Sequence, residues 1–374
     1  MLLVEQEDLA SHTSAASTKL IHGGLRYLEY GEFRLVREAL IERERLLGMA
    51  PHIIWPLRFV LPQLHSPRPA WMVRLGLFLY DHIGGRKALP ATQTVDLARS
   101  PLGEGQARRT QGIRLFRLLG GRQPPGRAQR DGRGRARGTD RNPHPPGLRP
   151  ALRPTVAGHH RAPGEERVVE ARALVNAAGP WVEDVLQRSA GARQDRGVRL
   201  IKGSHIVVPR LYPGDHAFLL QNPDRRVVFA IPYEGVYTLV GTTDEAWTGP
   251  PAHASIAEHE TAYLCETVSA YFDRAVTPAD VVWSYAGIRP LYDDHAANAS
   301  AVTRDYVLDL DAAEGRRRCS ACSAARSPRS ASWPSMPWAA SRRSSLRPGR
   351  PGLAALPCPA ATFRLPISRL SSTG

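Results

Sequence analysis

The sequence predicts an α/β chain in two parts: a strand–helix unit of the doubly wound type, and an α+β part with a mostly antiparallel sheet. An apolar run from Leu2 to Val4 that ends in Glu5, followed by a helix-patterned segment after Gly31, indicates the first part. Short β-rich runs interrupted by Gly and Pro indicate the second: "RLIKGSHIVVP", "RVVFAIPYEGVYTLVGTTD" and "DVVWSYAGIRPL". A chain of 374 residues, 42% of them hydrophobic, is long enough for two such domains.

The first element is typical of the second strand of a dinucleotide-binding fold. In that fold the acid after the strand, here Glu5, accepts hydrogen bonds from the adenosine ribose. An ordinary edge-strand glutamate leaves the same pattern, so this alternative stays open. The G-x-G-x-x-G turn that belongs to such a fold occurs nowhere in the sequence. We therefore expect the first strand and its glycine turn to be missing.

The next element is an amphipathic helix of about four turns that begins after Gly31. Its apolar residues recur at near-helical spacing: Phe33, Val36, Leu40 and Leu47.

A second helical segment, "RPAWMVRLGLFLYDHIGGRK", is apolar nearly all round from Trp71 to Tyr80. It is too short to span a bilayer. One reading is a helix in a membrane interface, with Trp55 and Trp71 at headgroup depth and the flanking basic residues on lipid phosphates. A buried core helix explains the pattern equally well.

The positive charge is concentrated in two windows. The chain carries a net +15, but residues 106–162 carry +12 and residues 316–374 carry +11, which leaves −8 for the rest. Both windows consist mainly of Arg, Pro, Gly, Ala and Ser, with no Lys and no recurring unit. This composition predicts disorder and is unlike nucleic-acid-binding tails, which mix Lys with Arg. We therefore expect no nucleic-acid partner.

Cysteine usage and hydropathy narrow the class further. Three of the four cysteines fall inside the second window, so a disulfide framework is not indicated. Cys319 and Cys322 form a C-x-x-C, but no second pair stands at zinc-site spacing, and no metal is expected. The sequence shows neither a signal peptide nor a transmembrane run, which predicts a cytoplasmic location.

Five motifs carry a family resemblance: "TSAASTKLIHGGLRYLEYGEFRLV", "LVNAAGPWV", "LIKGSHIVVPR", "AGIRPLYDD" and "VTRDYVLD". Together they resemble the FAD-dependent, quinone-reducing glycerol-3-phosphate dehydrogenases of aerobic metabolism. The resemblance covers residues 1–105 and 163–315. It implies a Rossmann-like FAD-binding domain, incomplete here, in residues 1–50 and 163–196. It also implies a substrate and membrane-facing α+β domain in residues 51–105 and 197–315.

The resemblance also implies the site. His205 and Arg289 would be catalytic, and Arg26, Tyr27 and Arg304 would bind the substrate. The residues implied to bind FAD are Glu5, Ser14, Ser17, Thr18, Lys19, Leu20, His22, Ala178, Gly179 and Trp181.

The chemistry fits these residue types. A planar guanidinium binds a phosphate through two parallel N–H donors, so Arg26, Arg289 and Arg304 are expected to clamp it. The C2 hydroxyl must lose a proton as hydride leaves for the flavin, and the imidazole of His205 suits a general base. A lone strand histidine is more often structural, and only the motif around His205 favours catalysis.

The implied reaction oxidises sn-glycerol 3-phosphate to dihydroxyacetone phosphate, and FAD passes the electrons to quinone. The implied partners are the cytoplasmic face of the inner membrane, as a peripheral contact, and a second copy of the chain. A related flavin amine or hydroxy-acid oxidase is the alternative enzyme. Nucleic-acid binding through the arginine-rich windows is the non-enzyme alternative.

The resemblance fails in the two arginine-rich windows, which suggests shifts of reading frame. One nucleotide out of register, residues 112–130 can be re-read as "GFDYSDCWVDDSRLVVLNA". In the other register, residues 318–338 can be re-read as "LLSVFGGKITTFRKLAEHAM". Both strings resemble the family. We therefore expect a chain that is out of frame in residues 106–162 and 316–374, and that retains FAD weakly or not at all because it lacks the phosphate-binding turn.

Overall fold

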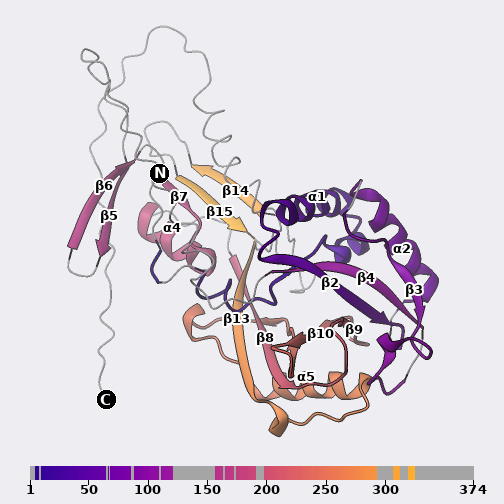
Figure 1. The fold of residues 1–374 in the computed structure, drawn as a ribbon. Coiled ribbons are helices and arrows are strands. Elements are labelled where there is room, and N and C mark those ends of the chain that lie inside the picture. Colours follow the sequence, from indigo (N-terminus) through magenta and orange to yellow (C-terminus); the bar gives the residue numbers. More distant parts are fainter. Residues whose placement is uncertain are drawn as a thin grey trace.

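The structure, a computed structural model, is built around one large sheet (Figure 1). It describes residues 5–7, 10–64, 66, 68–85, 88–108, 111–120, 156–162, 165–171, 174–190, 198–292, 306–311 and 319–324. The sheet has ten strands in the order β1-β4-β2-β9-β10-β11-β8-β12, with β3 paired to β4 and β13 paired to β8. Every pair is antiparallel except β2 with β9. The expected α/β class and mostly antiparallel sheet are confirmed.

The strands of this sheet come from both halves of the chain. Those of the first half are β1 (Leu20–Ile21), β2 (Ile54–Pro62), β3 (Gln93–Asp96) and β4 (Gln111–Gly120). Those of the second half are β8 (Val198–Pro209), β9 (Ala217–Gln221), β10 (Val227–Tyr233), β11 (Tyr237–Gly241), β12 (Glu245–Ala246) and β13 (Trp283–Tyr292). The two halves meet where Phe59 and Val60 pair with Ala217 and Phe218.

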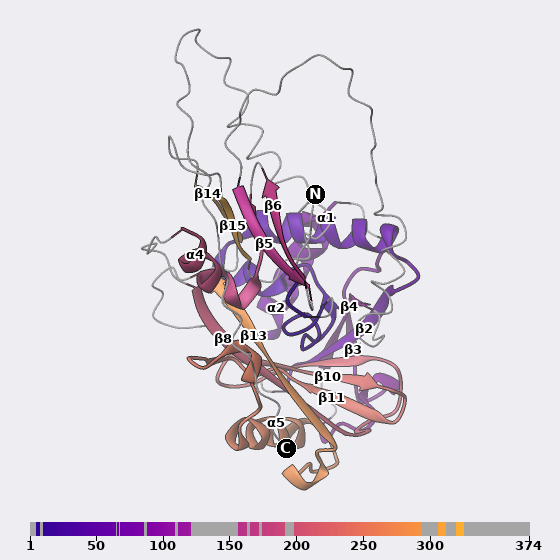
Figure 2. The ribbon, with the colours of Figure 1, turned by 90° about the vertical axis from the view of Figure 1, so that its left-hand side faces the viewer.

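Each face of the sheet buries its own apolar cluster because successive strand residues point to opposite faces. On one face Ile206 and Phe218 pack against Leu264 and Val268 of α5 (Glu258–Tyr271). On the other face Val207 and residues of β2 and β4 pack against Leu77 of α2 (Ala70–Ile83). Figure 2 shows β10 and β11 between these two layers.

The predicted amphipathic helix is confirmed as α1 (Phe33–Met49), which buries Val36 and Leu40 against Tyr80 of α2. A 3-10 helix, η1 (Leu25–Tyr30), precedes it between two glycines in the left-handed conformation, Gly24 and Gly31. These short elements hold the segment before α1 close to both helices.

Helix α2 is not a buried core helix. Leu77 and Tyr80 are buried, but five large apolar side chains on the opposite side are exposed: Trp71, Met72, Leu75, Phe78 and Leu79. Within the described part of the chain, no helix combines the length and the apolar character that crossing a bilayer requires.

A separate three-stranded sheet, in the order β14-β15-β7, lies beside the ten-stranded one (Figure 1). It consists of β7 (Leu174–Asn176), β14 (Tyr306–Asp311) and β15 (Cys319–Ala324), and β7 leads through η4 (Gly179–Trp181) into α4 (Val182–Ala190). Residues 306–311, which we expected in the substrate domain, pair with β15, and β15 pairs in parallel with β7. The division into domains stays a prediction. The remaining hairpin pairs β5 (Val156–Ala162) with β6 (Glu165–Ala171).

The disorder predicted for the two arginine-rich windows is wrong for three segments. β4 lies inside the sheet and buries Ile113, Leu115 and Leu118, while β5 and β15 are paired strands. A strand needs favourable alternation over only about ten residues. Arginine content averaged over a whole window therefore concealed the apolar residues of β4.

Candidate active site

Strands β8 and β13 form the floor of the site. Their antiparallel register sets His205 opposite Tyr285, Gly203 opposite Gly287, and Ile201 opposite Arg289. Directly opposed residues point to the same face of a sheet, so the predicted catalytic pair, His205 and Arg289, shares one face. The intervening pair of glycines leaves that face open to other groups.

The His205 imidazole is held on three sides. Its Nε2 lies 3.2 Å from the Thr18 hydroxyl, and its ring stacks on Tyr285 with centroids 4.7 Å apart and planes 14° apart. The ring also lies directly over Gly241, where a Cβ would overlap it. With 2% of its surface exposed, His205 is fixed in one orientation, and Nε2 faces the segment that carries Thr18.

Arg289 is held by the three residues that follow β11. Its Nη2 donates to the Thr242 hydroxyl at 2.7 Å and to the Thr243 carbonyl at 3.0 Å, and its Nη1 pairs with the Asp244 carboxylate. The guanidinium lies over Gly203, where a Cβ would overlap it. Arg289 is therefore an oriented cation with a counter-ion, and a phosphate would have to share it with Asp244.

The segment from Thr13 to Lys19 lies across β13. The Thr13 hydroxyl donates to the Ile288 carbonyl at 2.6 Å, and the methyl group of Ala16 lies where a Cβ on Gly287 would be. The Lys19 ammonium donates to the carbonyls of Ser14, at 2.8 Å, Ser17, at 3.4 Å, and Ala15. The ammonium of Lys19 thus fastens the turn, and the side chains of Ser14 and Ser17 are exposed.

The residues after Lys19 form the edge strand β1 and the segment that leads to α1. Leu20 begins β1, and the Nδ1 of His22 accepts a hydrogen bond from the Gly24 backbone at 3.0 Å. The ring of Tyr27 packs beside Gly24 and against the cluster formed by α1 and α2. His22 and Tyr27 therefore hold local structure, and their proposed ligand contacts stay predictions.

The turn after β7 lies beside the start of the segment Thr13–Lys19, although it comes from a distant part of the sequence. The Asn176 side chain donates to the Val182 carbonyl at 2.8 Å and accepts from the Ala178 backbone at 3.2 Å. This fixes Gly179 and Trp181, and the Trp181 ring meets His12 edge-on with centroids 4.7 Å apart. The structure thus places Trp181 beside the start of the segment that carries Ser14, Ser17, Thr18 and Lys19.

The remaining predicted site residues are Glu5, Arg26 and Arg304. Glu5 is exposed, and its carboxylate accepts a hydrogen bond from the backbone of the next residue at 2.8 Å. Arg304 lies outside the described residues, and so does the side chain of Arg26, although its backbone belongs to η1. Their roles in ribose and phosphate binding stay predictions.

Sequence reasoning missed several residues of the site. Tyr285, Thr242, Thr243 and Asp244 touch the predicted catalytic pair, and none of them was assigned a role. The alternating pattern of "SYAGIRP" places the aromatic ring, the glycine and the arginine on one face of a strand. That signal could have identified Tyr285 and Gly287.

A family model described as FAD dependent oxidoreductase matches residues 1–309. The D-erythritol 1-phosphate dehydrogenase of Brucella abortus is 49% identical over 324 residues, which are 84% of this chain and 63% of that protein. The glycerol-3-phosphate dehydrogenase of Pseudomonas aeruginosa is also 49% identical, over 84% of this chain and 61% of that protein.

A solved structure supports the fold. The glycerol-3-phosphate dehydrogenase from Bacillus halodurans, complexed with FAD, superimposes with a TM-score of 0.57 at 20% identity, over 91% of this chain and 59% of that one. The chain spans about three-fifths of the length of each protein compared. The matched family model covers most of the chain, and the chain belongs to the FAD dependent oxidoreductase family.

Proposed function

We propose that this chain belongs to an enzyme that oxidises the secondary alcohol of a phosphorylated polyol, with sn-glycerol 3-phosphate as substrate and dihydroxyacetone phosphate as product. The observation that carries the proposal is the shared face of β8 and β13, where an oriented imidazole and an oriented guanidinium flank a pair of glycines. The names of the relatives support the same class of substrate.

The described residues fit the ring end of FAD. From Ser14 to Thr18 all side chains are small, two of them are exposed, and Lys19 and Trp181 border the segment. A flat group can therefore approach this backbone closely. When bound, FAD supplies the acceptor for the hydride from C2 of the alcohol.

His205 is proposed to take the proton of the C2 hydroxyl at Nε2. The atom now faces the Thr18 hydroxyl at 3.2 Å, which is the kind of partner that a substrate hydroxyl would be. Tyr285 holds the plane of the ring, and burial keeps water away from it. Loss of this proton and of the C2 hydride together converts the alcohol into the ketone.

Arg289 is proposed to bind the phosphate. A guanidinium offers up to five N–H donors, which can be shared among several acceptors. The contacts to Thr242, Thr243 and Asp244 orient the guanidinium of Arg289. Asp244 would compete with the phosphate for the cation, so binding depends on the greater charge of the phosphate. Arg26 and Arg304 stay part of the proposed clamp.

Reconstitution tests the function. The full chain would be incubated with FAD, and reduction of an artificial electron acceptor would be followed with glycerol 3-phosphate and, separately, with glycerol. Activity that requires the phosphate, and that falls at least about a hundredfold in His205→Ala, supports the proposal. Equal turnover of glycerol would contradict the role of Arg289, and oxidation of glycine instead would favour the amine-oxidase alternative.

D-erythritol 1-phosphate is the second candidate substrate, because the two relatives with these names are equally identical to the chain. The two substrates differ in length and share the phosphate. The ratio of kcat/KM for the two compounds decides between them, whereas loss of activity in Arg289→Lys is expected for both.

We also propose a peripheral membrane contact through α2, with quinone in the bilayer as the electron acceptor. The exposed apolar side chains of α2 lie on one side of the helix, and Trp55 on β2 is exposed too. Arg74 is not available for lipid phosphate, because its guanidinium donates to Thr92 at 2.7 Å and 3.2 Å. Arg86 and Lys87 lie outside the described residues.

Vesicle flotation tests this contact. Phe78→Asp should abolish co-flotation of the chain with vesicles of phosphatidylethanolamine and phosphatidylglycerol. Val236→Asp is the control, because Val236 is exposed to 63% but lies in a turn of the second half of the chain. Equal loss in both variants would contradict a site on α2. Sedimentation of the same samples would show whether the chain forms the proposed homodimer.

We further propose that β4 is translated out of frame. Arg117 of β4 is buried, with 6% of its surface exposed, and its pKa is lowered to about 10, chiefly by burial and in part by the nearby Arg43, against a raising contribution from Tyr80. The re-read string has an aspartate at this position, and a carboxylate there would offset the charge of Arg43. Sequencing the locus tests the proposal: DNA that cannot encode both re-read strings in alternative frames would contradict it.

A further inference from the structure

A buried carboxylate on α5 lies beneath the site, on the opposite face of β8 from His205. We infer that Glu260, with Lys202 as its counter-ion, is a positioning residue for phosphate binding. It fixes the segment Thr242–Asp244, which in turn orients Arg289. The inference rests on the proposed function in one respect only, which is the assignment of Arg289 to the substrate phosphate.

Both oxygens of Glu260 are fully engaged. Oε1 accepts hydrogen bonds from the Ser204 hydroxyl at 2.9 Å and the Thr243 hydroxyl at 2.6 Å. Oε2 accepts from the Ala257 backbone at 2.8 Å and lies 2.8 Å from the Lys202 ammonium. The Glu260 side chain is 0% exposed and that of Lys202 is 6% exposed. Four donors around one carboxylate leave it no other orientation.

The surroundings keep Glu260 ionised. Burial raises the pKa of its carboxyl, but the hydrogen bonds from Lys202, Thr243, Ala257 and Ser204 outweigh burial and lower the pKa below its ordinary value. Glu260 also belongs to the first turn of α5, where the helix dipole favours a negative charge. A charged carboxylate is a stronger acceptor than a neutral one, so the contact with Thr243 is firm.

Thr243 transmits this position to Arg289. Its hydroxyl accepts from the Ser204 backbone at 2.9 Å while donating to Glu260, so the residue is held from two directions. Its carbonyl accepts from Arg289, and the residues on either side, Thr242 and Asp244, supply the other two acceptors. These three acceptors of Arg289 therefore belong to one segment whose central residue is fastened to Glu260.

A purely stabilising role is the competing explanation. Buried ion pairs contribute little net stability, because the cost of removing two charges from water offsets their attraction. An apolar pair of similar volume can hold α5 against β8 as well as the ion pair does. It offers no acceptor for the Thr243 hydroxyl, however, so it could hold α5 in place without fastening the segment Thr242–Asp244.

Glu260→Gln tests the inference in the full chain, with glycerol 3-phosphate as the titrant in calorimetry. We expect affinity to fall about tenfold or more, since one charge-assisted hydrogen bond to Thr243 is weakened. Glu258→Gln is the matched control, because Glu258 is exposed in the same first turn of α5, and its affinity should equal that of the wild type. Unchanged affinity in Glu260→Gln would overturn the inference.

The double variant Lys202→Met with Glu260→Met separates the two explanations. Recovery of the wild-type melting temperature with affinity still low supports positioning. Recovery of both would overturn it, because packing alone would then suffice. The same variant serves if Glu260→Gln fails to fold.

A readout without ligand separates this inference from the proposed function. Hydrogen exchange of the Arg289 side-chain Nε–H, assigned by its loss in Arg289→Lys, should accelerate in Glu260→Gln and not in Glu258→Gln. Unchanged exchange would overturn the positioning role. Accelerated exchange in a chain that never binds glycerol 3-phosphate would support the positioning of Arg289 while contradicting the proposed substrate.

Discussion

Replacing Arg117 with methionine is expected to stabilise the protein. The guanidinium lies in the sheet core, with its central carbon 5.2 Å from the centroids of the Phe59 and Phe229 rings. Burial lowers the pKa of Arg117 from its ordinary value to about 10, with a raising contribution from Tyr80 and a lowering one from Arg43. At about 1.4 kcal/mol per pKa unit, this fall corresponds to a cost of about 3 kcal/mol for keeping the charge.

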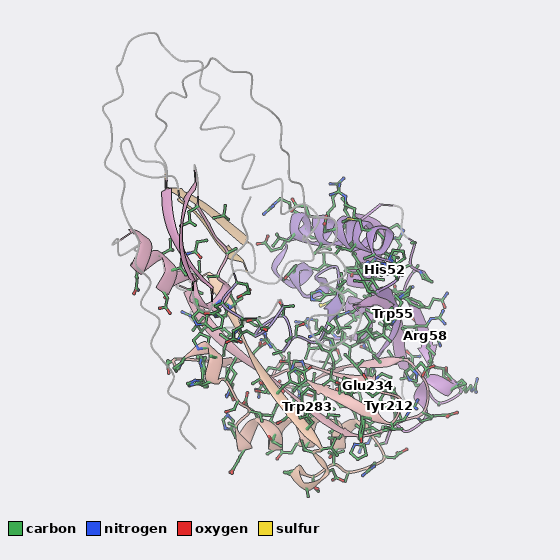
Figure 3. All side chains as sticks on the ribbon, turned by 60° about the vertical axis from the view of Figure 1, so that its left-hand side comes forward. His52, Trp55, Arg58, Tyr212, Glu234 and Trp283 are labelled. Atoms are coloured by element: carbon green, nitrogen blue, oxygen red, sulfur yellow. The ribbon has the colours of Figure 1, made fainter. Side chains whose placement is uncertain are left out.

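Methionine would remove that cost and keep an unbranched side chain between the two rings. The lost cation–π contacts offset part of the gain, at about 1 kcal/mol, so Arg117→Met should raise the free energy of unfolding by about 1–2 kcal/mol. Urea unfolding at pH 7, followed by tryptophan fluorescence, measures it. Arg58→Met is the control on the neighbouring strand: Arg58 is exposed, lies toward the outer side of the molecule in Figure 3, and should change stability by less than about 0.5 kcal/mol.

The pH dependence gives the same reasoning a second check. The folded pKa lies below the unfolded one, so the cost of the charge is fully present below pH 10 and shrinks as the pH rises further. The advantage of Arg117→Met should therefore narrow above pH 10. A variant that loses about 1 kcal/mol or more at pH 7 would refute the reasoning, because the ring contacts would then outweigh desolvation.

Three further predictions concern the site, the exposed surface of α1 and the core. Gly203→Ala should lower affinity for glycerol 3-phosphate about tenfold or more, because the added methyl group displaces Arg289, whereas Gly48→Ala, in an open helical position, should leave affinity unchanged. Gly48→Ala should also raise the free energy of unfolding by about 0.5–1 kcal/mol in urea titrations. Burial lowers the pKa of His216 to about 4, so the unfolded chain takes up the proton first as the pH falls from about 6.5, and the wild type loses stability. At pH 4.5 the free energy of unfolding of His216→Phe should therefore exceed that of the wild type by about 1–2 kcal/mol.

Local patterns in the sequence account for α1 and for the strands β8, β10, β11 and β13. α1 carries apolar residues at near-helical spacing, and the strands are short runs rich in β-branched and aromatic residues. The exposed side of α2 was not predictable, because a helix that is apolar nearly all round carries no signal for which side its neighbours cover. β4 was not predicted for the opposite reason. Its local apolar pattern was concealed because the composition was averaged over the whole arginine-rich window 106–162.

The same distinction applies to the site. His205, Arg289 and Thr18 were assigned through a resemblance between motifs, and the structure does bring them onto or against one face. Asp244 and Glu260 could not be found from the sequence, because their contacts depend on the register of β8 with β12 and on the docking of α5. Neither relation is encoded in a window of neighbouring residues.

The parallel pairing of β2 with β9 also bears on how the protein is made. Phe59 pairs with Ala217, so the open edge of β2 has no partner until a strand far along the chain has left the ribosome. At typical synthesis rates of about 5–20 residues per second, that edge stays uncovered for roughly 8–30 seconds. An apolar strand edge exposed for so long invites pairing with other nascent chains. Chaperone capture during translation should therefore govern the yield of this protein more than its final stability does.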